Sequence, residues 1–70
     1  MAENHIRRLL RLPAVKHQVG LGRTAIYQKV KSGEFPAPIS LSNNGRAVAW
    51  DSLAVDAWIE SRIAAARGAK

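Results

Sequence analysis

The sequence predicts a small, mainly α-helical domain with a single β-hairpin. Seventy residues allow one domain with one modest core, because a chain of this length buries only about 60% of its unfolded surface. Apolar residues recur at helical spacing in three stretches, which are bounded by glycines or by capping residues. Between the second and third stretches, an Asn-Gly pair separates two short strand-like segments, and this pair is typical of a hairpin turn.

Polar residues fill the beginning of the chain, and we expect a flexible N-terminal arm over residues 1–8. Three leucines then bring the chain to the core in a short extended segment: Leu9, Leu10 and Leu12. Because the sequence contains no linker, repeat or low-complexity stretch, residues 9–67 are expected to form one domain.

The first helix is expected to be about two turns long. Pro13 suits the first helical position, where its missing N–H is not needed, so the helix should run from Pro13 to about Val19. Val15 and Val19 lie at i and i+4 and should face inward. Gly20 is a good residue for ending the helix.

A second helix is predicted over residues 23–32, between Gly22 as a tolerable N-cap and Gly33 as its end. Ile26 and Val30 share one side of this helix and should belong to the core. The opposite side is polar and carries Thr24, Gln28 and Lys31, with Ala25 and Tyr27 beside them.

The hairpin follows the second helix. Pro36 and Pro38 impose an extended path, after which residues 39–41 alternate in the manner of a strand. Residues 42–45 should form the turn, because Asn and Gly both accept positive φ, and residues 46–50 should form the return strand.

The third helix is expected to start after Asp51, which is a strong N-cap, and to continue to Gly68. Trp50 and Trp58 should form the centre of the core. An apolar stripe recurs at helical spacing and is formed by Val55, Trp58, Ile59, Arg62 and Ile63, where the aliphatic stem of the arginine borders the stripe.

The charge of the chain is distributed unevenly. The formal net charge is +6, from eleven Lys and Arg against five acids. Residues 4–33 contain no acid, and they carry seven basic residues: Arg7, Arg8, Arg11, Lys16, Arg23, Lys29 and Lys31. In residues 51–70, acids and bases balance. A surface of one sign attracts a polyanion, and DNA, RNA and an anionic membrane surface all qualify; ordinary solubilising charge is the simpler alternative.

Several classes of protein are disfavoured. The sequence has no cysteine for a disulfide or a thiolate metal site, and charged residues, proline and glycine interrupt every apolar stretch before it reaches the length of a membrane span. Residues 20–25 spell G-x-G-x-x-A, but a predicted helix precedes them and no acid lies between Glu34 and Asp51 to bind a ribose. We therefore expect a cytoplasmic protein that is not an enzyme and has no cofactor, metal or small-molecule ligand.

Two helices joined by a tight turn and followed by a hairpin form a winged helix-turn-helix, the arrangement that places one helix in the major groove of double-stranded DNA. Arginine pairs with guanine, glutamine with adenine, and threonine with a base edge or a thymine methyl group. The predicted base-reading residues are therefore Arg23, Thr24 and Gln28.

Other polar residues are better suited to the DNA backbone, where contacts set the register without reading the sequence. The predicted phosphate contacts are Lys16, His17, Tyr27, Lys31, Asn43, Asn44 and Arg46. A lone winged helix covers few base pairs, so we also expect self-association on DNA, although no heptad repeat marks an interface.

Over residues 8–66 the sequence resembles the AlpA family of prophage regulators. Six segments carry the resemblance: LLRLP (9–13), GL (20–21), RTAIY (23–27), KSGEFPAPI (31–39), GRAVAW (45–50) and VDAWI (55–59). The resemblance implies a fold of the excisionase and MerR-like winged-helix group. It also implies a nucleoid-associated transcriptional regulator of prophage or integrative-element genes, such as an integrase gene.

Two positions depart from the pattern of the family. Gly22 stands where members usually have a serine that caps the recognition helix, and Gln28 stands where a basic residue is common. The first departure leaves the start of the helix less firmly fixed, and the second means that the base preference does not carry over. Two alternatives remain open: an excisionase-like architectural factor in site-specific recombination, and an RNA-binding or protein-adaptor module.

Overall fold

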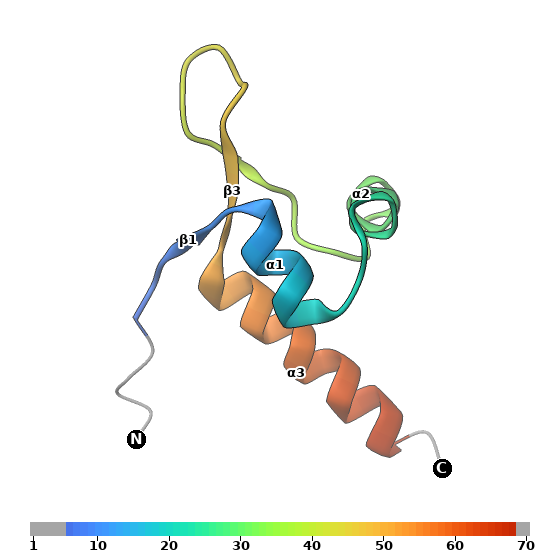
Figure 1. Ribbon diagram of the computed structural model, residues 1–70. Helices are drawn as coiled ribbons and strands as arrows, with labels where there is room; N and C mark the ends of the chain where they lie inside the picture. Colours follow the sequence, from blue (N-terminus) through green and yellow to red (C-terminus); the bar gives the residue numbers. More distant parts are fainter. Residues whose placement is uncertain (1–5, 69–70) are drawn as a thin grey trace.

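A three-stranded antiparallel sheet and three helices form the computed structural model, which describes residues 6–68 (Figure 1). In chain order the elements are β1 (Leu9–Leu10), α1 (Leu12–Val19), α2 (Arg23–Ser32), β2 (Ile39–Ser40), β3 (Val48–Asp51) and α3 (Ser52–Gly68). Strand β3 lies at the centre of the sheet, between β1 and β2. The β2–β3 loop and the far end of α3 point in opposite directions (Figure 1). The prediction of a mainly helical domain with a β-hairpin is confirmed, and the structure adds a third strand, β1, to that hairpin.

The core is centred on Trp50, which is fully buried on the central strand. Its indole N–H donates a hydrogen bond to the carbonyl oxygen of Pro36 at 2.9 Å, so the polar edge of the ring is satisfied inside the protein. The other buried members come from β1, from each helix and from the segment after α2: Leu10, Val15, Ile26, Val55 and Phe35. Trp58 packs against this cluster, with its ring 5.0 Å from that of Phe35. The prediction that Trp50 lies at the centre of the core is confirmed, whereas Trp58 is partly buried and packs against the core from its edge.

Glycines end the first two helices, as the sequence predicted. Gly20 has φ 74°, and its N–H donates to the carbonyl of Lys16, whereas Gly33 ends α2 with φ 85°. These are left-handed conformations that glycine adopts without steric cost. Helix α1 starts at Leu12, one residue earlier than predicted, with Pro13 inside its first turn. Proline is tolerated there because the first N–H groups of a helix have no partner within it.

The pairing of β1 with β3 is a feature that the sequence analysis missed. Leu9 lies opposite Asp51, and Leu10 lies opposite Trp50. Just before β1, the N–H of Arg8 donates to the hydroxyl of the buried Ser52, whose own N–H donates to the carbonyl of Arg8. The expected arm thus has its last residue bonded to the start of α3, while residues 1–5 of that arm lie outside the described residues.

The hairpin differs from the prediction in its turn. Leu41, Arg46 and Ala47 lie outside the strands, although the first was predicted in one strand and the other two in the return strand. The loop closes with the N–H of Leu41 bonded to the carbonyl of Ala47 at 2.7 Å. Within residues 6–68 only glycines have positive φ, so Gly45 adopts it and Asn44 does not. A tight two-residue Asn-Gly turn requires positive φ at both residues, so this pair does not form one. The loop is therefore longer than predicted.

Helix α3 starts as predicted, because Asp51 accepts a hydrogen bond from the N–H of Leu53 at 3.1 Å. Its predicted apolar stripe packs on the core only in part. Val55 is buried and Ile59 packs against the core, but Arg62 is exposed and Ile63 is 40% exposed. The helical periodicity continues beyond the point where the core ends. In the described part of the chain, no helix is long and apolar enough to cross a membrane.

Replacing the central tryptophan should remove most of the stability of the domain. We expect Trp50→Ala to lower the free energy of unfolding by about 3–5 kcal/mol, since it empties the centre of the core. Such a loss approaches the total stability of a small domain. Urea unfolding followed by circular dichroism measures it. Ile39→Ala, in the same sheet but 45% exposed, is the control and should change stability by about 0.5 kcal/mol or less. Equal losses in both variants would contradict the central role of Trp50.

Candidate nucleic-acid interface

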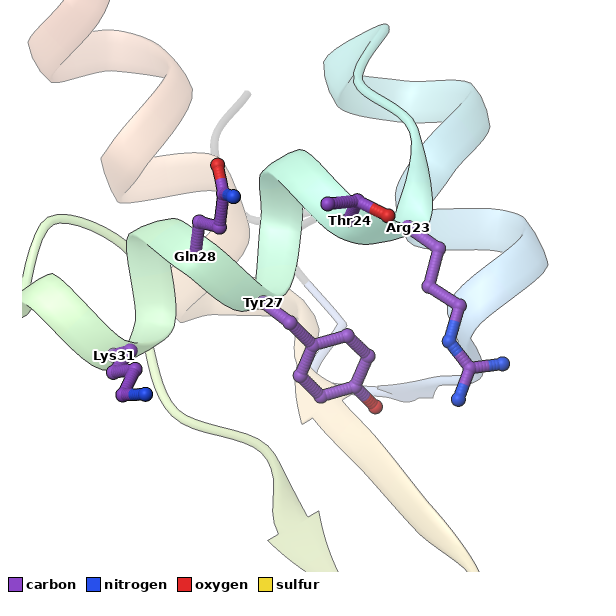
Figure 2. A pocket seen from close by; sticks show the side chains of 5 residues that line it. All are labelled: Arg23, Thr24, Tyr27, Gln28 and Lys31. Atoms are coloured by element: carbon purple, nitrogen blue, oxygen red, sulfur yellow. The ribbon is translucent and has the colours of Figure 1, made fainter.

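The outward face of α2 forms an open hollow of about 380 Å³. Five side chains line it, and we call them the α2 face: Arg23, Thr24, Tyr27, Gln28 and Lys31 (Figure 2). All five were singled out from the sequence, three of them as base-reading residues and two as phosphate contacts. The structure thus brings the three predicted base-reading residues and two of the seven predicted phosphate contacts together on one surface.

Helical spacing arranges the α2 face in two rows. Arg23, Tyr27 and Lys31 follow one another at intervals of four residues, and Thr24 and Gln28 form the next row. Thr24 and Gln28 lie together on one side in Figure 2, with the Tyr27 ring on the other. Every member is exposed except Tyr27, which is half-buried. The face therefore presents hydroxyl, amide and cationic groups to the solvent, and its helix is anchored through Ile26 on the opposite side.

Tyr27 connects the α2 face to the core. Its ring meets the Trp50 ring edge-on, with the two centroids 5.9 Å apart and the planes at 65°. The Arg23 guanidinium lies 5.7 Å from the centroid of the Tyr27 ring, within the range of a cation–π contact. Figure 2 shows the Tyr27 ring extending alongside the Arg23 side chain. The direction of the arginine is thus set in part by a ring that the core holds in place.

The lysines of α2 differ in their surroundings. Lys29 lies on another side of the helix from Lys31, and its ammonium group is 3.4 Å from a carboxylate oxygen of Glu34. Lys31 is exposed and lines the hollow. Glu34, which follows α2, therefore offsets the charge of Lys29 behind the α2 face. It does not offset the cations of the α2 face itself.

The other predicted phosphate contacts lie outside the hollow. Lys16 and His17 are exposed in the last turn of α1. Asn43, Asn44 and Arg46 are exposed in the β2–β3 loop. The structure thus places these residues on two further surfaces, one on the helix before the turn and one on the loop.

Asn44 has a structural role that the sequence analysis did not foresee. Its side-chain oxygen accepts hydrogen bonds from the N–H of Arg46 at 2.9 Å and from the hydroxyl of Ser42 at 2.7 Å. An asparagine side chain that bonds to the backbone two residues later is a common way to shape a turn. The amide nitrogen of Asn44 is a donor in addition to these bonds.

A second hollow, of about 490 Å³, lies between α2 and α3. It is lined by Leu21, Lys29, Glu34, Trp58, Ser61 and Arg62. These residues come from distant parts of the chain, so no sequence spacing could have indicated the hollow. Among the described residues, no group of three or more histidines or acids is placed to hold a metal ion.

Comparison with known proteins identifies the family. The family model described as prophage CP4-57 regulatory protein (AlpA) matches residues 8–63, from the residue before β1 well into α3. The chain belongs to the AlpA family of prophage regulatory proteins. The resemblance found in the sequence is confirmed, and the AlpA match includes the whole α2 face and the β2–β3 loop.

One curated relative is an uncharacterized protein, ORF88, of Enterobacteria phage P4. It is 47% identical to this chain over 57 residues, which are 81% of the chain and 62% of the relative. The chain thus spans less than two thirds of the length of this relative. No solved structure matches the chain.

The hydrogen bonds of Asn44 predict an effect on the loop. Asn44→Ala should speed hydrogen exchange at the Arg46 amide by about fivefold, because a typical hydrogen bond contributes about 1 kcal/mol. Exchange followed by NMR measures this effect. Asn43→Ala is the matched control, since the hydrogen bonds described in this loop use the side chain of Asn44 and not that of Asn43. An Arg46 amide that exchanges equally fast in both variants would show that Asn44 does not hold the loop.

Proposed function

We propose that this protein is a sequence-specific double-stranded DNA-binding transcriptional regulator of the AlpA type. It would regulate genes of a prophage or integrative element, such as an integrase gene. The observation that carries the proposal is the α2 face, where three side chains suited to base edges lie exposed beside cations on one short helix. Membership of a family of prophage regulatory proteins supports it.

The chemistry of the α2 face suits the major groove. That groove is about 12 Å wide and admits a helix, and each base pair presents a distinct pattern of donors and acceptors there. Arg23 would pair with guanine, Gln28 with adenine, and Thr24 with a base edge or a thymine methyl group. The contact of Tyr27 with Trp50 supports a fixed orientation of Arg23, which such pairing needs.

The remaining cations would hold the DNA backbone. In this proposal the β2–β3 loop acts as the wing, with Arg46 and the asparagines at its tip against phosphates, and Lys16 and His17 act in the same way from α1. Lys31 and the Tyr27 hydroxyl would contact phosphates at the edge of the groove. A duplex ligand would place the protein at the nucleoid in the cytoplasm.

The two alternatives from the sequence analysis use the same surfaces differently. An excisionase-like factor would bend the duplex and fill adjacent sites cooperatively. An RNA-binding or adaptor module would bind single-stranded RNA, or a protein, in preference to duplex DNA. The exposed polar row of Thr24 and Gln28 on a helix is suited to duplex base edges, which favours duplex DNA over RNA or a protein partner. Membership of a family of prophage regulatory proteins is the reason that we favour the regulator over the excisionase-like factor.

The reading role is tested with a duplex that the purified protein selects from a random-sequence library. Gln28→Ala should weaken binding to the selected duplex by about 1–3 kcal/mol and leave binding to a scrambled duplex nearly unchanged, as expected for a lost base contact. Thr24→Ala should act in the same direction. Titration by fluorescence anisotropy measures both affinities. Equal losses on both duplexes would place the reading residues elsewhere, and preferential binding of single-stranded RNA would contradict the proposal as a whole.

The two lysines of α2 provide a matched pair for the backbone contacts. Lys31→Ala should weaken binding to every duplex and reduce the slope of log affinity against log salt by about one unit, because one fewer phosphate is neutralised. Lys29→Ala removes the same charge from the same helix, but at a position paired with Glu34, and should leave the slope nearly unchanged. If both variants change the slope equally, the side of α2 that carries the charge does not matter, and the proposed orientation of α2 on the DNA is wrong.

A further inference from the structure

The hollow on the α2 face has an apolar wall, although all five residues that line it are polar. Carbon makes up most of that wall. These side chains carry their carbon in the methyl group of Thr24, in the ring of Tyr27 and in the aliphatic stems of the other three. Figure 2 shows the charged ends of Arg23 and Lys31 directed away from the helix. The α2 face thus combines polar tips with an exposed apolar surface.

Thr24 presents two different groups at this surface. Its side chain branches into a methyl group and a hydroxyl group, and in Figure 2 the methyl group lies on the side of Gln28 and the hydroxyl on the side of Arg23. The residue is exposed. A contact with a polar base edge would use the hydroxyl, whereas a contact with a thymine methyl group would use the methyl branch. The apolar wall beside Thr24 favours the second of these contacts.

The major groove offers one kind of group that suits an apolar wall. The edges of the base pairs carry hydrogen-bond donors and acceptors there, and the apolar group among them is the C5-methyl group of thymine. A donor or acceptor placed against carbon would lose its water without gaining a partner, which is unfavourable. The chemistry of the hollow therefore selects a methyl group over the other groups of the groove.

We propose that the hollow of the α2 face receives the C5-methyl group of a thymine, and that Thr24 contacts it through its own methyl group. This contact rests on the proposed function, because it needs α2 in the major groove. The hollow, of about 380 Å³, is larger than one methyl group, so the edge of the pyrimidine ring enters with it. The polar ends of Arg23 and Gln28 stay available for neighbouring bases.

Removing single methyl groups from the DNA tests the contact. Uracil pairs as thymine does and lacks only the C5-methyl group, so each thymine of the selected duplex is replaced by uracil in turn. Replacement at one thymine in each bound site should weaken binding about fourfold, as expected for one methyl group that is no longer buried. Replacement at the other thymines is the control and should change binding little. Competition titration followed by fluorescence anisotropy measures the affinities. If no replacement weakens binding, the proposal is wrong.

Two substitutions of Thr24 separate its methyl group from its hydroxyl. Thr24→Ser removes the methyl and keeps the hydroxyl, whereas Thr24→Val replaces the hydroxyl with a second methyl group. In Thr24→Ser, the loss caused by uracil at the critical thymine should shrink to about twofold, and in Thr24→Val it should stay about fourfold. Because Thr24 is exposed, both variants should stay folded, which circular dichroism checks. Equal losses in the two variants, or the reverse order, would overturn the contact with Thr24.

The same titrations separate this proposal from the proposed function. A protein that binds no duplex would contradict both. A protein that prefers the selected duplex to a scrambled one, but is insensitive to every uracil, would keep the proposed function and lose the thymine contact. Cytosine can carry the same methyl group after modification, so each cytosine of the selected duplex is also methylated at C5 in turn. Tighter binding there, without a loss at any thymine, would overturn thymine as the occupant of the hollow.

Discussion

The packing around Trp50 is the contact on which the rest of this small domain depends. The tryptophan lies on the central strand, so it is fixed by pairing with β1 on one edge of the sheet and by β2 on the other. Its polar edge is bonded to the carbonyl of Pro36, and its ring meets Tyr27 of α2. One side chain thus positions α2 relative to the sheet. Because Tyr27 also lies against Arg23, the same packing reaches the surface where we propose that DNA binds.

The basic residues that give the chain its net charge of +6 have different surroundings in the structure. The N-terminal part of the chain supplies seven of the eleven Lys and Arg residues, but their neighbours differ: Arg7 lies 3.4 Å from Asp51, and Lys29 lies 3.4 Å from Glu34. Both pairs are at least partly exposed, so they contribute little to stability. Their effect is on the field at the surface, since one pair offsets a cation behind the α2 face and the other offsets a cation just before β1. The positive charge left on α2 comes from Arg23 and Lys31, which lie in the row of Tyr27 next to the row of Thr24 and Gln28.

Features fixed by neighbouring residues could be predicted from the sequence, and features fixed by distant ones could not. The limits of α2 followed from the glycines at its ends, and the start of α3 followed from Asp51, because caps act within one turn. The pairing of β1 was missed, since two residues carry no periodicity and Ser52, which bonds to Arg8, lies far along the chain. The α2 face was predicted from helical spacing alone, whereas its link to Trp50 required the fold. The exposed end of α3 was also missed, because periodicity shows which side of a helix is apolar but not where the core stops.

The half-buried position of Tyr27 between four exposed neighbours has a consequence for how such a protein can diverge. Exposed side chains with no core contact can change with effects on stability within about 0.5 kcal/mol, and Thr24 and Gln28 are of this kind. Under the proposed function, a new base preference could therefore arise at these positions by single substitutions, without compensation elsewhere. A change at Tyr27 alters the packing on Trp50 as well as the surface. Relatives with this architecture should accordingly vary most in the row of Thr24 and Gln28, while the aromatic residue beside it stays constrained by folding.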